Sequence, residues 1–222
     1  MRVLVVGNRG DDDAGFVGER LAQRGGELSV RHRDHPETLA GPADVVLVLG
    51  SEWSVYWEHV APNVAAEAAL LRDAHGRGVP VLGICFGAQM AAHALGGTVH
   101  RAVAPEIGWY EIDSHEPLVI ERGPWMQWHY DTFTVPPEAK ALARSAVGPQ
   151  AFVAGRTLAV QFHPEVDDTV VARWIGSGGE AELVAIGQTP GALLARTRSE
   201  NEAARRRAHR LVDWFLDEVA AR

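Results

Sequence analysis

Short, wholly apolar runs separated by segments with helical patterns constrain the fold of this chain more than any other feature. Val3–Val6 is the first such run, and Asp44–Gly50 and Val79–Ile84 contain the next two. Runs of β-branched residues without polar alternation are typical of parallel strands that are buried on both faces. The helical segments predicted around them cover residues 16–23, 62–75 and 86–95. This alternation predicts an α/β fold, an open and mostly parallel sheet with helices on both faces.

The second half of the chain has a different texture. Shorter, turn-rich segments predict a small antiparallel extension of the sheet, with strands at residues 98–103, 107–113, 118–121 and 152–160. Thr189-Pro190 opens a long terminal helix, because proline is favoured in the first helical turn. The positions of this helix expected to face the core are Leu193, Thr197, Asn201, Ala204, Ala208, Leu211, Phe215 and Val219. Gly176–Gly179 is predicted to be a loop, and residues 1–222 are expected to form a single domain.

Charge and cysteine content narrow the classes of function. With 21 basic and 29 acidic residues, the net charge of −8 argues against nucleic acid or an anionic membrane as the main partner. No apolar run approaches the roughly 20 residues of a membrane span, and the apolar N-terminal stretch is too short for a signal peptide. The lone cysteine, Cys85, excludes an intramolecular disulfide and any multi-cysteine metal site. We therefore expect a cytoplasmic protein, with no metal and no cofactor.

The most informative segment is Gly83-Ile84-Cys85-Phe86-Gly87, which joins a predicted strand to a predicted helix. A nucleophile on such a turn, between two glycines that permit close backbone approach, is typical of a nucleophile elbow. Its side chain would lie at the carboxyl end of a central strand, where open α/β sheets bind ligands. Helix N–H groups there favour the thiolate, and Phe86 N–H is the natural oxyanion donor. The alternative, a small buried apolar cysteine, does not need the two glycines.

A nucleophilic thiol needs a base, and the base needs an orienting partner. Both are predicted in Gln161-Phe162-His163-Pro164-Glu165, which follows an apolar run. In a Cys–His–Glu arrangement, His163 takes the thiol proton and later protonates the leaving amine, while Glu165 fixes the tautomer. The three aspartates of Asp11–Asp13 are interpreted as a solvated loop that caps the next helix, and not as a cation or phosphate site.

Together, Gly83–Gln89 and Gln161–Glu165 resemble the class I glutamine amidotransferase domain. Glu106–Trp109 and Trp128–Phe133 are similar to stretches of the stand-alone branch that is called GMP-synthase-like. The resemblance implies a flavodoxin-like sheet and a catalytic triad of Cys85, His163 and Glu165. It also implies attack on the γ-carboxamide of glutamine, a γ-glutamyl thioester on the cysteine, and release of ammonia and glutamate.

The resemblance also assigns residues around the triad. Gln89 is expected to hold substrate, and His129, Tyr130 and Asp131 are expected to lie in the substrate pocket. Tyr130 departs from the family pattern, because a small residue is usual there, and a tyrosine would narrow or reshape the pocket. Tryptophans 53, 57, 109 and 128 are predicted near this edge, either as packing or as a wall of the substrate cleft.

The oxyanion site is the second departure from the family pattern. Phe86 N–H is one expected donor, and the loop around Gly50 and Ser51 is expected to supply the other. That loop commonly has paired glycines followed by proline, but this chain has Gly50-Ser51-Glu52-Trp53. One glycine remains, so an exposed N–H is still expected there.

Three functions stay open at this stage. The first is hydrolysis of glutamine, and the second is hydrolysis of a γ-glutamyl peptide or γ-glutamyl amine by the same triad. The third is a non-catalytic regulatory protein with this fold, against which the complete set of Cys85, His163 and Glu165 argues. The 57 residues after Glu165 are predicted to be helical, without a Gly-rich phosphate loop. Ammonia would then pass to a separate synthase subunit, or the chain would act as a hydrolase alone.

Overall fold

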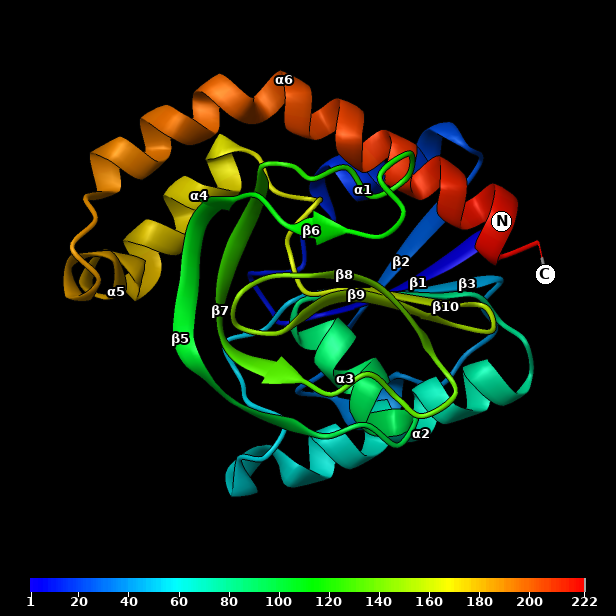
Figure 1. The fold of residues 1–222 in the computed structure, drawn as a ribbon. Helices are drawn as coiled ribbons and strands as arrows, with labels where there is room; N and C mark the ends of the chain where they lie inside the picture. The colour runs from blue at the N-terminus through cyan, green and yellow to red at the C-terminus, as the bar shows by residue number, and fades with distance from the viewer. Residues whose placement is uncertain (222) are drawn as a thin grey trace.

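The computed structural model describes residues 1–221 and has a central eight-stranded sheet (Figure 1). The strand order is β2-β1-β3-β4-β10-β9-β8-β6. The first five strands in this order are parallel neighbours: β2 (Glu27–His32), β1 (Arg2–Gly7), β3 (Val45–Val48), β4 (Val81–Ile84) and β10 (Thr157–Val160). The antiparallel extension consists of β9 (Pro149–Ala154), β8 (Lys140–Arg144) and β6 (Asp113–Ser114). The predicted mostly parallel sheet with an antiparallel extension is confirmed.

Alternate side chains of each parallel strand face opposite layers of helices. In β1, Val3 and Val5 pack into one core cluster with α1 (Gly15–Gln23) and α6 (Pro190–Trp214). Leu4 and Val6 pack into a second cluster with α2 (Ala61–Gly76) and α3 (Phe86–Ala94). Figure 1 shows α6 running across one side of the sheet while α2 and α3 cover the other. Because both faces are covered, these strands are continuously apolar.

A separate two-stranded sheet closes the end of the molecule where the parallel strands finish. It pairs β5 (Val99–Tyr110) with β7 (Trp125–Phe133), with a bulge between Arg101 and Glu106. Next to it lie α4 (Asp168–Trp174), a π-helical turn (Ile175–Gly179) and α5 (Glu180–Ala185), joined to it by a small apolar cluster. The remaining short helices are Pro36–Thr38, Glu58–Val60 and Phe215–Val219.

The predicted elements of the second half need several corrections. Residues 98–103 and 107–113 fall largely in one long strand, β5. Residues 118–121 are not a strand, because Val119 and Ile120 both donate backbone hydrogen bonds to Glu116 O in a turn. Residues 152–160 form two strands, β9 and β10, which turn at Gly155. Strands β7 and β8 were not predicted, and the loop predicted at 176–179 is a kinked π-helical turn.

The terminal helix is confirmed from its first residue. Thr189 is its N-cap, and its hydroxyl accepts a hydrogen bond from Ala192 N, 3.3 Å away. Seven of the eight positions predicted to face the core are buried, and Asn201 is half-buried. Within residues 1–221, no helix combines the length and the apolar character that a bilayer crossing requires.

Candidate active site

Cys85 lies at a sharp turn between β4 and α3. It is the one residue other than glycine in the described chain with a positive φ, at +52°. A Cβ on Gly83 would lie 2.5 Å from Gly87 O, and a Cβ on Gly87 would lie 2.2 Å from Val48 O. Neither position can carry a side chain without moving backbone. The strained turn therefore needs both glycines, which is the elbow geometry that the sequence predicts.

The register of three parallel strands brings distant segments to the cysteine. Strand β10 pairs with β4 through Val160 and Ile84, and Cys85 N donates a hydrogen bond to Val160 O at 2.8 Å. Strand β3 pairs with the other edge of β4, and Gly50 follows it. A Cβ on Gly50 would lie 3.7 Å from Cys85 Cβ and 3.1 Å from His163 Cε1. The sheet thus gathers Gly50, Cys85 and His163 at one edge.

His163 and Glu165 are buried and tightly paired. His163 Nδ1 lies 2.7 Å from Glu165 Oε1, and His163 Nε2 is buried with no hydrogen-bond partner in residues 1–221. The backbone on both sides is anchored, since His163 N donates to Met126 O and Phe16 N donates to Glu165 O. Gly15 packs against that carbonyl so closely that a Cβ would lie 1.9 Å from it. The imidazole is therefore held with Nδ1 on the carboxylate and Nε2 unpaired.

Electrostatics favour the charged form of His163. Burial acts to lower its pKa, but electrostatic interaction and hydrogen bonding with Glu165 and Cys85 outweigh burial and hold the pKa well above the ordinary value of 6.5. An imidazolium between a carboxylate and a sulfur is the state that supports a nucleophilic thiolate.

Two buried glutamine side chains form a short hydrogen-bonded chain that ends at the Cys85 sulfur. Gln161 Nε2 donates to Cys85 Sγ at 3.5 Å, and Gln89 Nε2 donates to Gln161 Oε1 at 3.2 Å. Gln89 also approaches the backbone oxygen of Asp131 at 3.4 Å. Gln161 was not among the predicted site residues. Its position before the histidine in the motif was the available signal, because the strand register sets it beside the cysteine.

His129 and Asp131 are buried and bonded within the protein. His129 Nε2 lies 3.1 Å from Glu106 Oε2, and its Nδ1 lies 3.0 Å from Asp131 O. The Asp131 carboxylate accepts hydrogen bonds from Ser54 Oγ at 2.5 Å and from Tyr56 OH at 2.9 Å. Both residues line the cavity, but the His129 contacts lie within the β5–β7 pair, and the Asp131 carboxylate joins that pair to the loop after β3.

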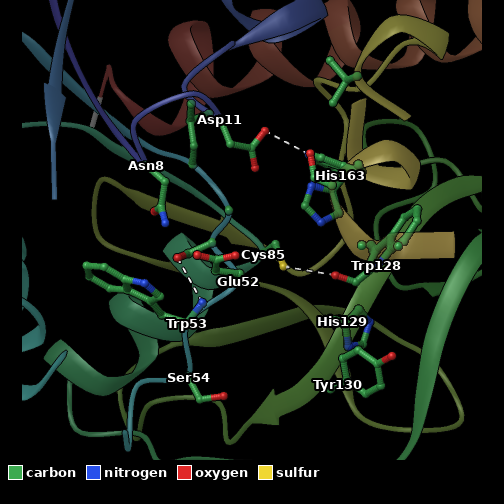
Figure 2. A pocket seen from close by; sticks show the side chains of 18 of the residues that line it. Asn8, Asp11, Glu52, Trp53, Ser54, Cys85, Trp128, His129, Tyr130 and His163 are labelled. Atoms are coloured by element: carbon green, nitrogen blue, oxygen red, sulfur yellow. Dashed lines mark hydrogen bonds between the residues drawn. The ribbon is translucent and has the colours of Figure 1, made fainter. Parts of the chain in front are cut away.

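A cavity of about 860 Å³ opens above Cys85. Figure 2 shows Asn8, Glu52 and Trp53 on one side of the cysteine, and Trp128, His129 and Tyr130 on the other. Tyr130 is half-buried, and the Arg101 guanidinium lies 4.3 Å from the centre of its ring. The four predicted substrate residues, Gln89, His129, Tyr130 and Asp131, all line this cavity.

Trp174 is a cavity residue that the sequence analysis missed. Its ring packs edge-on against the His163 ring, with centroids 4.9 Å apart, and its Nε1 donates to Asp11 Oδ1 at 2.9 Å. Arg173 forms an ion pair with the same carboxylate. Asp11 therefore does not belong to a merely solvated loop. Trp109, predicted near this edge, instead donates to Thr197 Oγ1 on α6 and does not line the cavity.

The segments predicted to supply the oxyanion donors are next to Cys85 in sequence or line the same cavity, and a residue that the sequence analysis did not single out contacts them. Phe86 opens α3, so its N–H has no acceptor within the helix. Gly50 and Ser51 follow β3. Arg33, whose side chain is fully buried, donates hydrogen bonds to Leu49 O and Gly50 O. Its neighbours in sequence are exposed or polar, so no pattern marked it as buried.

Among residues 1–221, no three side chains of the His, Cys, Asp or Glu type come together in a group that could hold a metal ion.

Comparison with known proteins places the chain among amidotransferases. Residues 18–173 match the family model described as glutamine amidotransferase class-I. A GMP synthase [glutamine-hydrolyzing] of Aeropyrum pernix is 37% identical over 188 residues, which are 77% of this chain and 34% of that protein. A protein of the same description from Aquifex aeolicus is 32% identical over 186 residues, or 78% of this chain and 34% of that protein. The chain thus spans about a third of the length of these curated relatives.

Solved structures resemble the chain over nearly its whole length. A glutamine amidotransferase from Thermotoga maritima superposes with a TM-score of 0.86 at 27% identity, covering 98% of this chain and 99% of that one. A glutamine amidotransferase from Methylobacillus flagellatus superposes with a TM-score of 0.84 at 23% identity, covering 99% of this chain and 94% of that one. The second likeness concerns the fold alone.

Proposed function

This chain belongs to the class I glutamine amidotransferase family, and from that premise we propose that it hydrolyses the γ-amide of glutamine through a γ-glutamyl thioester on Cys85. The observation that carries the proposal is the convergence of Gly50, Cys85 and His163 at the carboxyl ends of adjacent parallel strands. The cysteine is on a strained elbow, and the histidine is oriented by Glu165.

In the first half-reaction, the Cys85 sulfur attacks the γ-carboxamide carbon. His163 takes the thiol proton, and its raised pKa favours the resulting imidazolium. The carbonyl oxygen becomes an oxyanion, to which the N–H groups of Phe86 and of the Gly50–Ser51 segment would donate. When the tetrahedral intermediate collapses, the C–N bond breaks and His163 protonates the leaving nitrogen, so that ammonia departs.

In the second half-reaction, water attacks the thioester carbon. Neutral His163 removes a proton from that water, a second oxyanion forms, and collapse breaks the C–S bond. The thiolate leaves and recovers a proton from the imidazolium, so glutamate departs and the enzyme is restored. Glu165 keeps Nδ1 protonated through both steps, and thus Nε2 is always the proton carrier.

The four cavity residues divide into two roles in this proposal. Gln89, His129 and Asp131 are tied into buried hydrogen bonds and would shape the floor of the substrate pocket. Tyr130, which is half-buried, would contact the substrate itself.

We further propose that the ammonia passes to a separate synthase subunit in the cytoplasm. The curated relatives are described as GMP synthases, and the chain matches only about a third of their length. A reducing compartment would keep the lone Cys85 as a thiol.

A second candidate function is hydrolysis of a γ-glutamyl peptide or γ-glutamyl amine. The cavity of about 860 Å³ lies in the upper part of the roughly 300–1,000 Å³ range of drug-sized sites, so a substrate larger than glutamine would fit. Tyr130 and Arg101 would then contact the larger leaving group.

The test is release of glutamate and ammonia from L-glutamine by the purified chain, beside Cys85→Ala and the control His93→Gln, which alters an exposed histidine of α3. We expect turnover in the wild type and the control, and none in Cys85→Ala. A panel of γ-glutamyl peptides and amines separates the two candidates by kcat/KM. A wild-type chain that turns over none of these substrates, and whose Cys85 is not labelled by a glutamine-like electrophile, would contradict the proposal.

A further inference from the structure

Arg33 is a charged side chain with no access to solvent. It follows β2, and its side chain is 0% exposed. Its Nε lies 3.3 Å from Oε2 of Glu67 on α2, whose side chain is 2% exposed. Burying a charge is costly unless the charge is paired and hydrogen-bonded.

The guanidinium is directed at the backbone next to the cysteine. Arg33 Nη1 donates to Gly50 O at 3.1 Å, and Nη2 donates to Leu49 O at 2.9 Å. Nη2 also approaches Val6 O at 3.4 Å. The carbon of the guanidinium lies 4.6 Å from the centre of the Phe86 ring. Arg33 therefore touches both segments that are expected to supply oxyanion donors.

Peptide geometry links these carbonyls to the N–H groups. In a trans peptide, the C=O of one residue and the N–H of the next point in opposite directions. A hydrogen bond to Leu49 O therefore orients Gly50 N–H, and a hydrogen bond to Gly50 O orients Ser51 N–H. Both N–H groups are turned away from the guanidinium. Gly50 itself imposes little torsional restraint, so the loop needs an outside contact to hold these peptides.

Arg33 is itself held in place by its backbone. Its N–H donates to Gly7 O at 3.1 Å, and its carbonyl accepts from Asn63 Nδ2 at 2.9 Å. With Glu67 at the side chain, the residue is anchored at both ends. Because Arg33 is already ordered, it can hold the loop without a further loss of conformational entropy when substrate binds.

We propose that Arg33, held by Glu67, is a positioning residue that keeps the peptides on either side of Gly50 in the orientation that accepts the oxyanion. This inference rests on the proposed function, because the oxyanion belongs to amide hydrolysis. The two hydrogen bonds also polarise these peptide groups, which makes their N–H groups better donors.

The test compares Arg33→Met, Arg33→Lys and the matched control Arg31→Met, which changes an exposed arginine two residues away. We expect Arg33→Met to lower kcat for glutamine by about 10²-fold, the lower end of the loss on removing one oxyanion donor. KM should stay within about threefold, since the oxyanion forms only during the reaction. The kcat of Arg33→Lys should lie between those of the wild type and Arg33→Met, because lysine keeps the positive charge but lacks the planar guanidinium that donates two hydrogen bonds at once. Arg31→Met should match the wild type.

Alkylation of Cys85 by iodoacetamide distinguishes the proposed positioning role from a merely structural role, which would lower turnover and alkylation together. Alkylation needs the thiolate but forms no oxyanion. We expect its rate and its pH profile in Arg33→Met to match the wild type while kcat falls. Turnover within twofold of wild type would overturn the inference, and so would a parallel loss of turnover and alkylation.

A double variant guards against misfolding. Removing one partner of a buried ion pair leaves the other charge unpaired, whereas removing both is often tolerated. Arg33→Met combined with Glu67→Gln should therefore fold and keep the kcat deficit. Recovery of wild-type kcat in the double variant would overturn the inference.

A crystal structure of this double variant decides the matter independently of activity. We expect the Leu49–Gly50 and Gly50–Ser51 peptides to be rotated relative to the wild type. Unchanged peptide orientations would overturn the inference, whatever the activity of the wild-type chain. Failure of the wild-type chain to hydrolyse any γ-glutamyl substrate would count against the proposed function alone.

Discussion

The two sides of the Cys85 cavity are built in contrasting ways. On the buried side, His163, Glu165 and Gln161 are each at most 4% exposed, and each makes a specific hydrogen bond. On the open side, Trp57 is 38% exposed and Tyr130 is half-buried. The buried side has side chains that packing holds in one arrangement, whereas the open side has side chains at the surface.

This contrast separates chemistry from recognition. Proton transfer and nucleophilic attack require groups held within about 0.5 Å of their working positions, which buried hydrogen bonds achieve. Recognition of different substrates or partners is better served by exposed residues on loops, which change without disturbing the core. Substitutions on the two sides should therefore have different kinetic signatures.

The largest expected effect is on the buried side, at the carboxylate that orients His163. Glu165→Gln removes the negative charge and permits the wrong tautomer, so kcat for glutamine should fall by up to about 10⁴-fold. Steady-state kinetics measure this, with Glu138→Gln as an exposed control. A loss below tenfold would show that Glu165 is not the orienting group.

Gly50→Ala tests the close approach between Gly50 and the His163 ring. The new Cβ would lie 3.1 Å from His163 Cε1, so the loop or the imidazole must shift by a few tenths of an ångström. We expect kcat to fall by up to about 10²-fold, as misplacement of reacting groups predicts. Gly41→Ala, at an exposed position with no atom near the new Cβ, is the control. Equal activity of the two variants would contradict the geometry.

The raised pKa of His163 predicts a pH dependence of stability. A charged His163 stabilises the fold below its ordinary pKa of 6.5, and this contribution is lost as pH rises through the raised pKa. Across that window the free energy of unfolding should fall by at most about 1.4 kcal/mol per pH unit, relative to His163→Gln.

Urea unfolding at a series of pH values from about 6.5, the reference pKa of histidine, upward measures this slope. Cys85→Ala should reduce it, because Cys85 is one cause of the raised pKa. Parallel curves for wild type and His163→Gln would show that the pKa of His163 is not raised in the folded protein.

The smallest expected effect is on the open side. Tyr130→Ala removes a half-buried ring that Arg101 covers, so KM should change by about three- to tenfold with kcat within about twofold. Arg101→Met should act in the same direction. Parallel assays with glutamine and a γ-glutamyl peptide sharpen the comparison, since the peptide reaches further toward the rim. A fall in kcat equal to that of Glu165→Gln would erase the distinction between the two sides.

Sequence reasoning succeeded where local pattern and topology agree. The apolar runs at residues 3–6, 44–50 and 79–84 predicted parallel strands because only a doubly covered sheet buries such runs on both faces. Cys85 was recognised from its flanking glycines, and in the structure a Cβ added to either glycine would lie less than 3 Å from a backbone atom. The terminal helix was recognised from its proline and its periodic face.

Sequence reasoning failed where partners are distant. Strand β7 was missed because its polar residues are buried against other strands and do not alternate in a simple way: Gln127 donates to Gln150 Oε1, and His129 Nε2 lies 3.1 Å from Glu106 Oε2. Arg33 resembles a surface residue until Glu67 and the carbonyls of the β3 loop surround it. Trp174 reaches His163 only because α4 folds back over the cavity.

The sequence by itself determined the class of fold, the elbow at Cys85, and the pairing of a base with an acid two residues later. These features depend on local backbone sterics and on hydrophobic periodicity, which short segments carry alone. Only the tertiary structure decided which strands are neighbours of β4, and therefore that Gln161 contacts the sulfur and that the buried Arg33 bonds to the backbone of Gly50. Contacts of this kind form between segments that are far apart in the sequence, so their free energy depends on the folded arrangement and not on any single segment.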